Sequence, residues 1–167
     1  MNSVIRLAVP ADVPDMAEVL CRSWEVAYRD IIPAEFIHEK NSTRLEQYRQ
    51  SITDDNSTQY VIQENRKTIG IMWVAPSQDD DMGDNCYDVH AIYLHPDYSQ
   101  QGIGTQAMEF AFDIARNLGK TIITVWVLKE NLNSVRFCEK CGFLADGKVK
   151  EREYGKALLI IRMRKDL

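Results

Sequence analysis

Apolar residues along the chain recur with two different periods, which separates the predicted helices from the predicted strands. Residues 4–9 form a short β-rich run that is typical of a strand. A helix with one apolar face follows and ends before Pro33, and a second helix is predicted over residues 42–52, ahead of a polar loop at residues 53–58. The apolar positions of the first helix are Val13, Met16, Leu20, Trp24 and Ala27.

The middle of the chain predicts a hairpin, a further strand and a long helix. Two strands over residues 60–63 and 68–74 are separated by a charged turn, and residues 76–85 are predicted to form a solvated acidic loop. Residues 87–94 again have the composition of a strand, and from Gln101 the pattern becomes helical. The apolar positions of this helix are Ile103, Ala107, Phe110, Ala111, Ile114 and Leu118.

The last third predicts a buried strand, a short helix and a closing hairpin. Residues 121–128 form a continuous apolar, β-branched run, which indicates a strand covered on both faces. Either Asn131 or Asn133 is suited to cap the helix that follows, because a short polar side chain can accept a hydrogen bond from the first helical turn. Residues 143–154 and 156–164 then predict two paired strands.

Composition narrows the class of protein. The 167 residues are 45% hydrophobic, which predicts a single domain over residues 1–167 with its own core. No apolar run approaches the roughly 20 residues that span a bilayer, and residues 1–6 carry no secretory pattern, so a cytoplasmic protein without a membrane partner is expected. The four cysteines are expected to be thiols, namely Cys21, Cys86, Cys138 and Cys141.

Charge argues against nucleic acid as a partner. The net charge is -5, and no block of Lys and Arg is present that would neutralise phosphates. Small amines, neutral or cationic, are the more compatible class of partner.

A glycine-bearing turn at residues 95–105 lies between a predicted strand and the long helix. Gly102 and Gly104 let the backbone approach a ligand, and the free N–H groups of the first helical turn favour an anion such as a pyrophosphate. The spacing fits neither a Walker loop nor a dinucleotide-binding fingerprint. Taken alone, the same glycines are equally compatible with a merely tight turn.

Two motifs give this turn a context. The run Ile92-Tyr93-Leu94-His95-Pro96, followed by residues 100–104, resembles the V-x-P and [RQ]-x-x-G-x-[GA] motif of the GNAT superfamily of N-acetyltransferases. A second signature of that family, N-x-x-[AS]-x-x-F-Y-x-K-x-G-F, is matched by Asn131, Ser134, Phe137, Lys140, Gly142 and Phe143. The order of the predicted elements also resembles the family over nearly the whole chain.

The resemblance implies an α/β (α+β) fold, in which a mixed, mainly antiparallel sheet of about seven strands is flanked by about four helices. It further implies an acetyl-CoA-dependent N-acetyltransferase. The acetyl group would pass directly, in a ternary complex, to a primary amine of a small molecule or peptide. The alternative is an acyl-CoA-binding module with weak or no catalysis, which would bind the cofactor without turnover.

The resemblance also assigns the cofactor contacts. Coenzyme A would lie where two neighbouring parallel strands splay apart, with its pyrophosphate on the backbone of residues 100–105. The N–H of Leu94 would face the thioester oxygen, and Asn131 would either bind the pantetheine arm or cap its helix. The residues expected to contact the cofactor are Ile92, Tyr93, Leu94, Ser99, Gln100, Gln101, Gly102, Ile103, Gly104, Thr105, Asn131 and Asn133.

Two positions depart from the family pattern. Ser99 replaces an Arg or Gln that usually braces the loop, and Cys138 replaces the Tyr that often protonates the leaving thiolate. Cys138 could act as the acid or as an acyl-accepting nucleophile, while Tyr98, Tyr154 or solvent could supply the proton instead. Its pairing with Cys141 as a C-x-x-C favours packing over a metal site, because no further ligands stand at a zinc-like spacing.

An amine must lose its proton before it attacks a thioester, so a general base is expected beside the donor strand. Asp88, acting through water, is the favoured base, and His90 shares its face of the strand. Alternatively, Asp88 would be a solvated residue at the start of the strand, and His90 would be a half-buried residue that only packs against its neighbours.

By the same resemblance, the first helix walls the acceptor pocket. Trp24 and Tyr28 would form an aromatic wall, and Glu25 between them would favour a cationic amine. For Trp24, a place in the core is the stronger alternative. A homodimer is a further expectation, because the apolar strand at residues 158–163 could pair across an interface.

Overall fold

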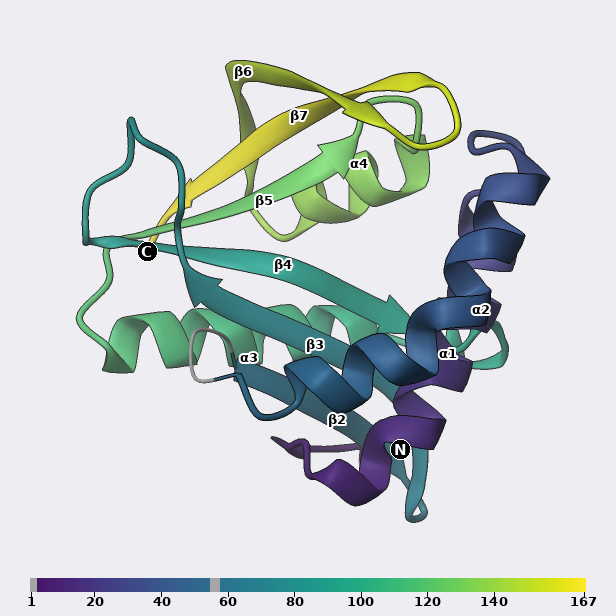
Figure 1. Cartoon of the computed structure of the whole chain (residues 1–167). Coiled ribbons are helices and arrows are strands. Elements are labelled where there is room, and N and C mark those ends of the chain that lie inside the picture. Colours follow the sequence, from purple (N-terminus) through teal and green to yellow (C-terminus); the bar gives the residue numbers. More distant parts are fainter. Residues whose placement is uncertain (1–2, 55–57) are drawn as a thin grey trace.

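A computed structural model describes residues 3–54 and 58–167. Its seven strands form one sheet in the order β1-β2-β3-β4-β5-β7-β6, and four α-helices cover the two faces in the part of the chain described (Figure 1). The strands are β1 (Val4–Leu7), β2 (Thr58–Glu64), β3 (Lys67–Pro76), β4 (Cys86–Leu94), β5 (Ile122–Leu128), β6 (Leu144–Glu153) and β7 (Ala157–Asp166). The helices are α1 (Val13–Ala27), α2 (Ala34–Ser51), α3 (Ile103–Asn117) and α4 (Leu132–Lys140).

The sheet is mixed and mainly antiparallel, as predicted. Strands β4 and β5 are the parallel pair, and α3 makes the crossover between them, because parallel neighbours need a long connection. Their pairing joins only Cys86–Val89 to Ile122–Val125, although both strands continue further. Beyond this point β4 and β5 diverge and leave an opening within the sheet.

Two cores lie on opposite faces of the sheet. Helices α3 and α4 pack on one face, where Met108 and Phe112 of α3 meet Phe143. Helices α1 and α2 cover the other face, where Met16, Leu20 and Ile37 are buried (Figure 1). The opening between β4 and β5 is therefore walled by both layers.

A β-bulge at His90 changes which face the end of β4 presents. Trp73 of β3 pairs with Ala91 and Val74 pairs with Val89, so His90 is the extra residue. Val89 belongs to the α3 core, whereas Tyr93 packs in the α1 core and Leu94 packs beside α3. Simple alternation would have placed Val89 and Tyr93 on one face.

Three sequence predictions differ from the structure. Helix α2 begins at Ala34 rather than at residue 42. The sequence pattern missed its first two turns because Ile37 is the one buried residue of α2 and its mostly polar surface shows no helical period. Leu118 is 56% exposed, and the core face of α3 instead includes Met108, Phe112 and Ala115. The loop predicted at residues 53–58 is shorter, because β2 starts at Thr58, and its residues 55–57 lie outside the described chain.

The acidic loop before β4 is held to the sheet by ion pairs and is not fully solvated, contrary to the prediction from the sequence. Arg162 of β7 is only 2% exposed and forms ion pairs with Asp79 at 3.1 Å, Asp81 at 2.7 Å and Asp146 at 2.6 Å. Lys150 adds a pair with Asp79 at 2.6 Å. Burial alone would raise the pKa of Asp79, but hydrogen bonds from these cations lower the pKa below its ordinary value.

The proposed pairing of residues 158–163 across a dimer is wrong. Strand β7 pairs with β5 along one edge and with β6 along the other, so both edges are occupied within the chain. Within residues 3–54 and 58–167, no helix is long and apolar enough to cross a membrane.

Candidate active site

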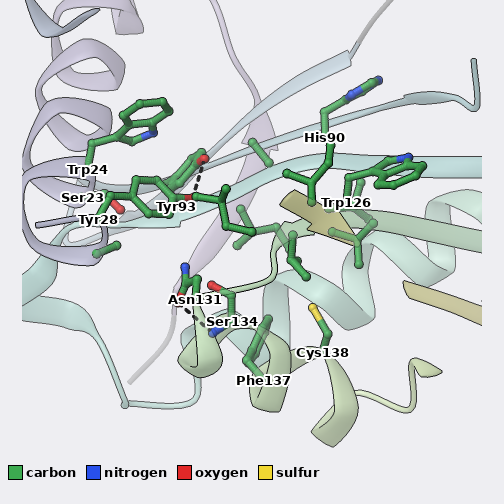
Figure 2. A pocket seen from close by; sticks show the side chains of 18 of the residues that line it. Ser23, Trp24, Tyr28, His90, Tyr93, Trp126, Asn131, Ser134, Phe137 and Cys138 are labelled. Atoms are coloured by element: carbon green, nitrogen blue, oxygen red, sulfur yellow. Dashed lines mark hydrogen bonds between the residues drawn. The ribbon is translucent and has the colours of Figure 1, made fainter. Parts of the chain in front are cut away.

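A cleft of about 330 Å³ opens where β4 and β5 diverge. Residues 89–94 of β4 and residues 125–128 of β5 form its sides, while α1 and α4 close it from opposite layers. Figure 2 shows Trp24 and Tyr28 at one end, Asn131, Phe137 and Cys138 along the α4 side, and His90 near Trp126.

The glycine turn adopts the conformations that its residues suggest. Gln100 has a φ of 60° and Gly102, the N-cap of α3, has a φ of 82°, so both occupy the left-handed region. A Cβ on Gly102 would meet no atom within 4 Å, whereas a Cβ on Gly104 would lie 3.3 Å from the ring of Phe137. Gly104 thus lets α4 approach α3, and Gly102 leaves open space before the first N–H groups of α3.

Side chains within the turn form hydrogen bonds in place of those that an Arg or Gln at position 99 would provide. Ser99 Oγ donates to the Pro96 carbonyl at 2.8 Å, and Gln101 Nε2 donates to the Asp97 carbonyl at 3.1 Å. His95 Nδ1 accepts from the Asp97 N–H at 3.3 Å. These bonds hold the backbone of the turn without an Arg at position 99.

The end of β4 offers backbone groups to the cleft. The His95 N–H donates to the Ile69 carbonyl of β3 at 2.8 Å. Because successive N–H groups of a strand point to opposite edges, the Leu94 N–H points away from β3, toward the edge that β5 has left. A ligand that lay along this edge would find unpaired strand groups.

Asn131 serves as the cap of α4 and also lines the cleft. Its Oδ1 accepts from the Ser134 N–H at 3.2 Å, and the residue is 7% exposed. Asn133 is exposed and lies outside the cleft lining. The structure therefore brings only the first of these asparagines to the candidate site.

Cys138 lines the cleft with a thiol that is poorly suited to ionise. It is 3% exposed, and burial raises the pKa of the thiol to about 12. All four cysteines are free thiols, and the described chain contains no group of three or more side chains placed to hold a metal ion.

Asp88 and His90 form a dyad, but only His90 lines the cleft. Asp88 Oδ2 lies 3.3 Å from His90 Nδ1, and Asp88 Oδ1 accepts from Thr124 Oγ1 at 3.0 Å. Asp88 is 6% exposed, and this burial raises the pKa of its carboxyl, an effect that His90 and Thr124 only partly offset. The carboxylate lies behind the imidazole.

The aromatic wall predicted on α1 is present, but its carboxylate is not. The Trp24 and Tyr28 rings lie 5.0 Å apart, and the Tyr28 hydroxyl is 3.2 Å from that of Tyr93. Trp24 is both a core residue and part of the cleft wall. Glu25 is exposed and pairs with Arg22 at 3.0 Å, away from the cleft.

Sequence reasoning missed several residues around the cleft. Trp126 of β5 lines it, and Arg44, Tyr48 and Trp73 line an adjoining cavity of about 370 Å³ that also contacts His90. Trp126 lay in an apolar run that gave no indication of a site. Arg44 and Tyr48 lie on the weakly periodic helix α2, so no pattern singled them out.

Solved structures share this fold. The PaiA N-acetyltransferase from Thermoplasma acidophilum, solved in complex with coenzyme A, is 21% identical with a TM-score of 0.79, and the match covers all of both chains. The YncA putative acetyltransferase from Salmonella typhimurium, solved with acetyl-CoA, is 20% identical with a TM-score of 0.72, over 100% of this chain and 95% of that one.

Comparison of sequences identifies the family. An uncharacterized N-acetyltransferase of Methanocaldococcus jannaschii, MJ1207, is 24% identical over 144 residues, which are 83% of this chain but only 59% of that protein. The model of the acetyltransferase (GNAT) family matches residues 18–143. This match spans both motifs, the diverging strands and the first turn of α3, and the chain belongs to the GNAT family of acetyltransferases.

Proposed function

We propose that this protein is an acetyl-CoA-dependent N-acetyltransferase, which transfers the acetyl group directly to a primary amine in a ternary complex. The observation that carries the proposal is the cleft between β4 and β5, with the first turn of α3 beside it and walls from both layers. A donor and an acceptor that entered from opposite faces would meet there without a covalent enzyme intermediate.

The residues present fit coenzyme A. The open space before Gly102 and the free N–H groups of residues 103–105 suit a pyrophosphate, and the unpaired edge of β4 suits the amides of a pantetheine arm. When bound, acetyl-CoA would supply the activated thioester. Leu94 would hold the thioester oxygen through its N–H, and Asn131 would border the pantetheine arm as it caps α4.

His90 is the group best placed to receive the proton of the amine. It lines both the cleft and the adjoining cavity, whereas Asp88 lines neither. Asp88 therefore acts as a positioning residue, which holds Nδ1 and turns the other imidazole nitrogen outward. The sequence favoured Asp88 itself as the base, and its burial behind His90 supports this different division of roles.

Cys138 has no part in this proposal as acid or nucleophile. A thiol with a pKa of about 12 is almost entirely protonated at neutral pH and gives up its proton reluctantly. Of the two tyrosines considered, Tyr154 lines the cleft, but burial raises the pKa of its phenol, so its proton, like that of Cys138, is held tightly. Solvent would therefore return a proton to the leaving thiolate.

The test is turnover of acetyl-CoA against a panel of amines, followed by mass so that the protein thiols do not interfere. His90→Gln should lower kcat by about 100-fold or more with unchanged acetyl-CoA affinity, since general bases contribute roughly 10²–10⁴. Asp88→Asn should lower kcat by about 10- to 100-fold. The matched control is His38→Gln, on the exposed surface of α2, which should keep full activity.

The alternative of a binding module has its own result. Tight acetyl-CoA binding without turnover of any amine would support it over an enzyme. Failure to bind acetyl-CoA would overturn both. Full activity of His90→Gln would remove His90 from the mechanism and leave the transferase proposal standing.

A further inference from the structure

A cavity of about 370 Å³ lies between α1, α2 and the sheet, beside the cleft. Its walls include Trp24, Arg44, Tyr48 and Trp73, and it shares Trp24, Ala91, Tyr93 and His90 with the cleft. A molecule in this cavity would therefore reach the imidazole that we propose as the base. The cavity lies on the face opposite α3, on the side left for the acceptor.

Arg44 brings a positive charge into this cavity without a counter-charge. Its Nε and Nη2 atoms are buried and have no hydrogen-bond partner, and its guanidinium lies 4.2 Å from the centre of the Trp24 ring. No carboxylate of residues 3–54 or 58–167 lies within 4.0 Å of it. Burial lowers the pKa of the guanidinium, and burial also raises the pKa of the neighbouring Tyr48 phenol, which therefore carries no negative charge at pH 7.

A second donor on the same wall is also unsatisfied. The Trp24 Nε1 atom is buried and has no partner. A buried charge or donor without a partner is unfavourable, and native chains rarely leave one without a reason. The third guanidinium nitrogen, Arg44 Nη1, is not enclosed in this way, so it is the donor that a bound acceptor of hydrogen bonds would contact.

Arg162, which is buried as a whole residue, has its charge satisfied within the chain. Arg162 is surrounded by Asp79, Asp81 and Asp146, which satisfy its guanidinium within the protein. Glu25, the carboxylate expected in the acceptor pocket, pairs with Arg22 on the exposed side of α1 instead. The charge on the cavity wall is thus positive, the reverse of what the sequence suggested.

We propose that the acceptor is a small amine that carries a carboxylate, such as an α-amino acid, and that Arg44 binds this carboxylate while the amino group lies at His90. The proposal rests on the transferase function above. A guanidinium binds a carboxylate through charge-assisted hydrogen bonds, and the rings of Trp24 and Trp73 would contact the rest of the substrate. A polyamine would instead place a cation against Arg44.

The experiment compares three matched amines, L-methionine, its amide and the decarboxylated amine, together with spermidine. The expected kcat/KM is roughly 10- to 100-fold higher for the amino acid than for its amide, the gain of one or two charge-assisted bonds. Equal rates for the acid and the amide, or a preference for spermidine, would overturn the proposal.

Variants of two arginines on α2 test whether Arg44 is the residue that gives the preference for a carboxylate. Arg44→Met should lower kcat/KM for the amino acid by roughly 10- to 100-fold and for the amide by much less. It should change Tm little, because the unpaired charge is removed while the methionine side chain can still pack on the Trp24 ring that the guanidinium now contacts. Arg49→Met is the matched control, since Arg49 is exposed and pairs with Glu46 at 3.8 Å on the surface of the same helix. An equal loss for both substrates, or a fall in Tm, would show a structural role.

A binding measurement separates this proposal from the transferase function. Calorimetry with L-methionine in the presence of coenzyme A should detect binding by the wild type and a roughly 10- to 100-fold weaker affinity for Arg44→Met. If binding follows this pattern but no amine is acetylated, the function fails and the carboxylate site stands. If several amines are acetylated without regard to a carboxylate, the function stands and the carboxylate site fails.

Discussion

Replacing Gly102 by alanine tests whether the left-handed N-cap of α3 is there for the cofactor. Gly102 has a φ of 82°, and an added Cβ would meet nothing within 4 Å, so the cost is backbone strain without a clash. An L-residue in this conformation costs about 1–2 kcal/mol. For a chain of this size that corresponds to a fall in Tm of about 2–8 °C.

Gly119 provides a matched control at the other end of the same helix. Its φ is 70°, and its Cβ would also meet nothing within 4 Å, so Gly119→Ala should lower Tm by a similar amount. The two variants should differ in acetyl-CoA affinity. Relaxation of residue 102 would turn the first N–H groups of α3 away from the pyrophosphate and remove the equivalent of one bond of about 1.5–3 kcal/mol, roughly a 10- to 100-fold loss of acetyl-CoA affinity.

Calorimetric titration of acetyl-CoA, together with thermal unfolding of both variants, makes the comparison. A weaker affinity for Gly102→Ala alone, at equal loss of Tm, supports a binding role for the turn. Equal affinities in the two variants would refute the reasoning, because the turn would then be only a helix cap.

Three further predictions concern the cleft and its supports. Cys138→Ala should keep kcat within about 3-fold, and mass spectrometry should find no acetyl adduct on the wild type, because a thiol with a pKa of about 12 is protonated; an adduct would establish a covalent route. Asn131→Ala should lower the free energy of unfolding by about 1 kcal/mol because the helix cap is lost, whereas Asn131→Ser should retain the cap. A raised KM for acetyl-CoA in both variants would show that Asn131 also contacts the cofactor. Arg162→Met should lower the free energy of unfolding, measured with urea at pH 7, by about 3–5 kcal/mol, because the carboxylates around Arg162 lose their partner. Since the pKa of Asp79 is lowered in the folded chain, the part of this difference that comes from Asp79 is full above about pH 4 and is lost as the pH falls through the lowered pKa; a difference that does not change with pH would contradict this reasoning.

Local sequence determined the elements and the cofactor turn. The sequence pattern located α1 and placed the ends of α3 and of all seven strands within about two residues, because apolar periods and turn residues are local signals. Gly102 and the two candidate caps Asn131 and Asn133 were also found from the sequence, since a left-handed residue and a helix cap are set by their immediate neighbours; the structure selected Asn131. The second helix was only partly found, because its surface is polar almost all round.

Tertiary structure decided which side chains meet. The bulge at His90 turns Tyr93 toward α1 and Leu94 toward α3, and only the pairing with β3 creates it. The sequence offered Asp88 as the base and Glu25 as the carboxylate of the acceptor pocket, but Asp88 is buried behind His90 and Glu25 is paired at the surface. Arg44 enters the acceptor cavity because α2 packs against α1, and no local pattern contains that contact. Charge and hydrogen bonding across a fold depend on neighbours that are distant in the chain, so only the assembled structure fixed the candidate site.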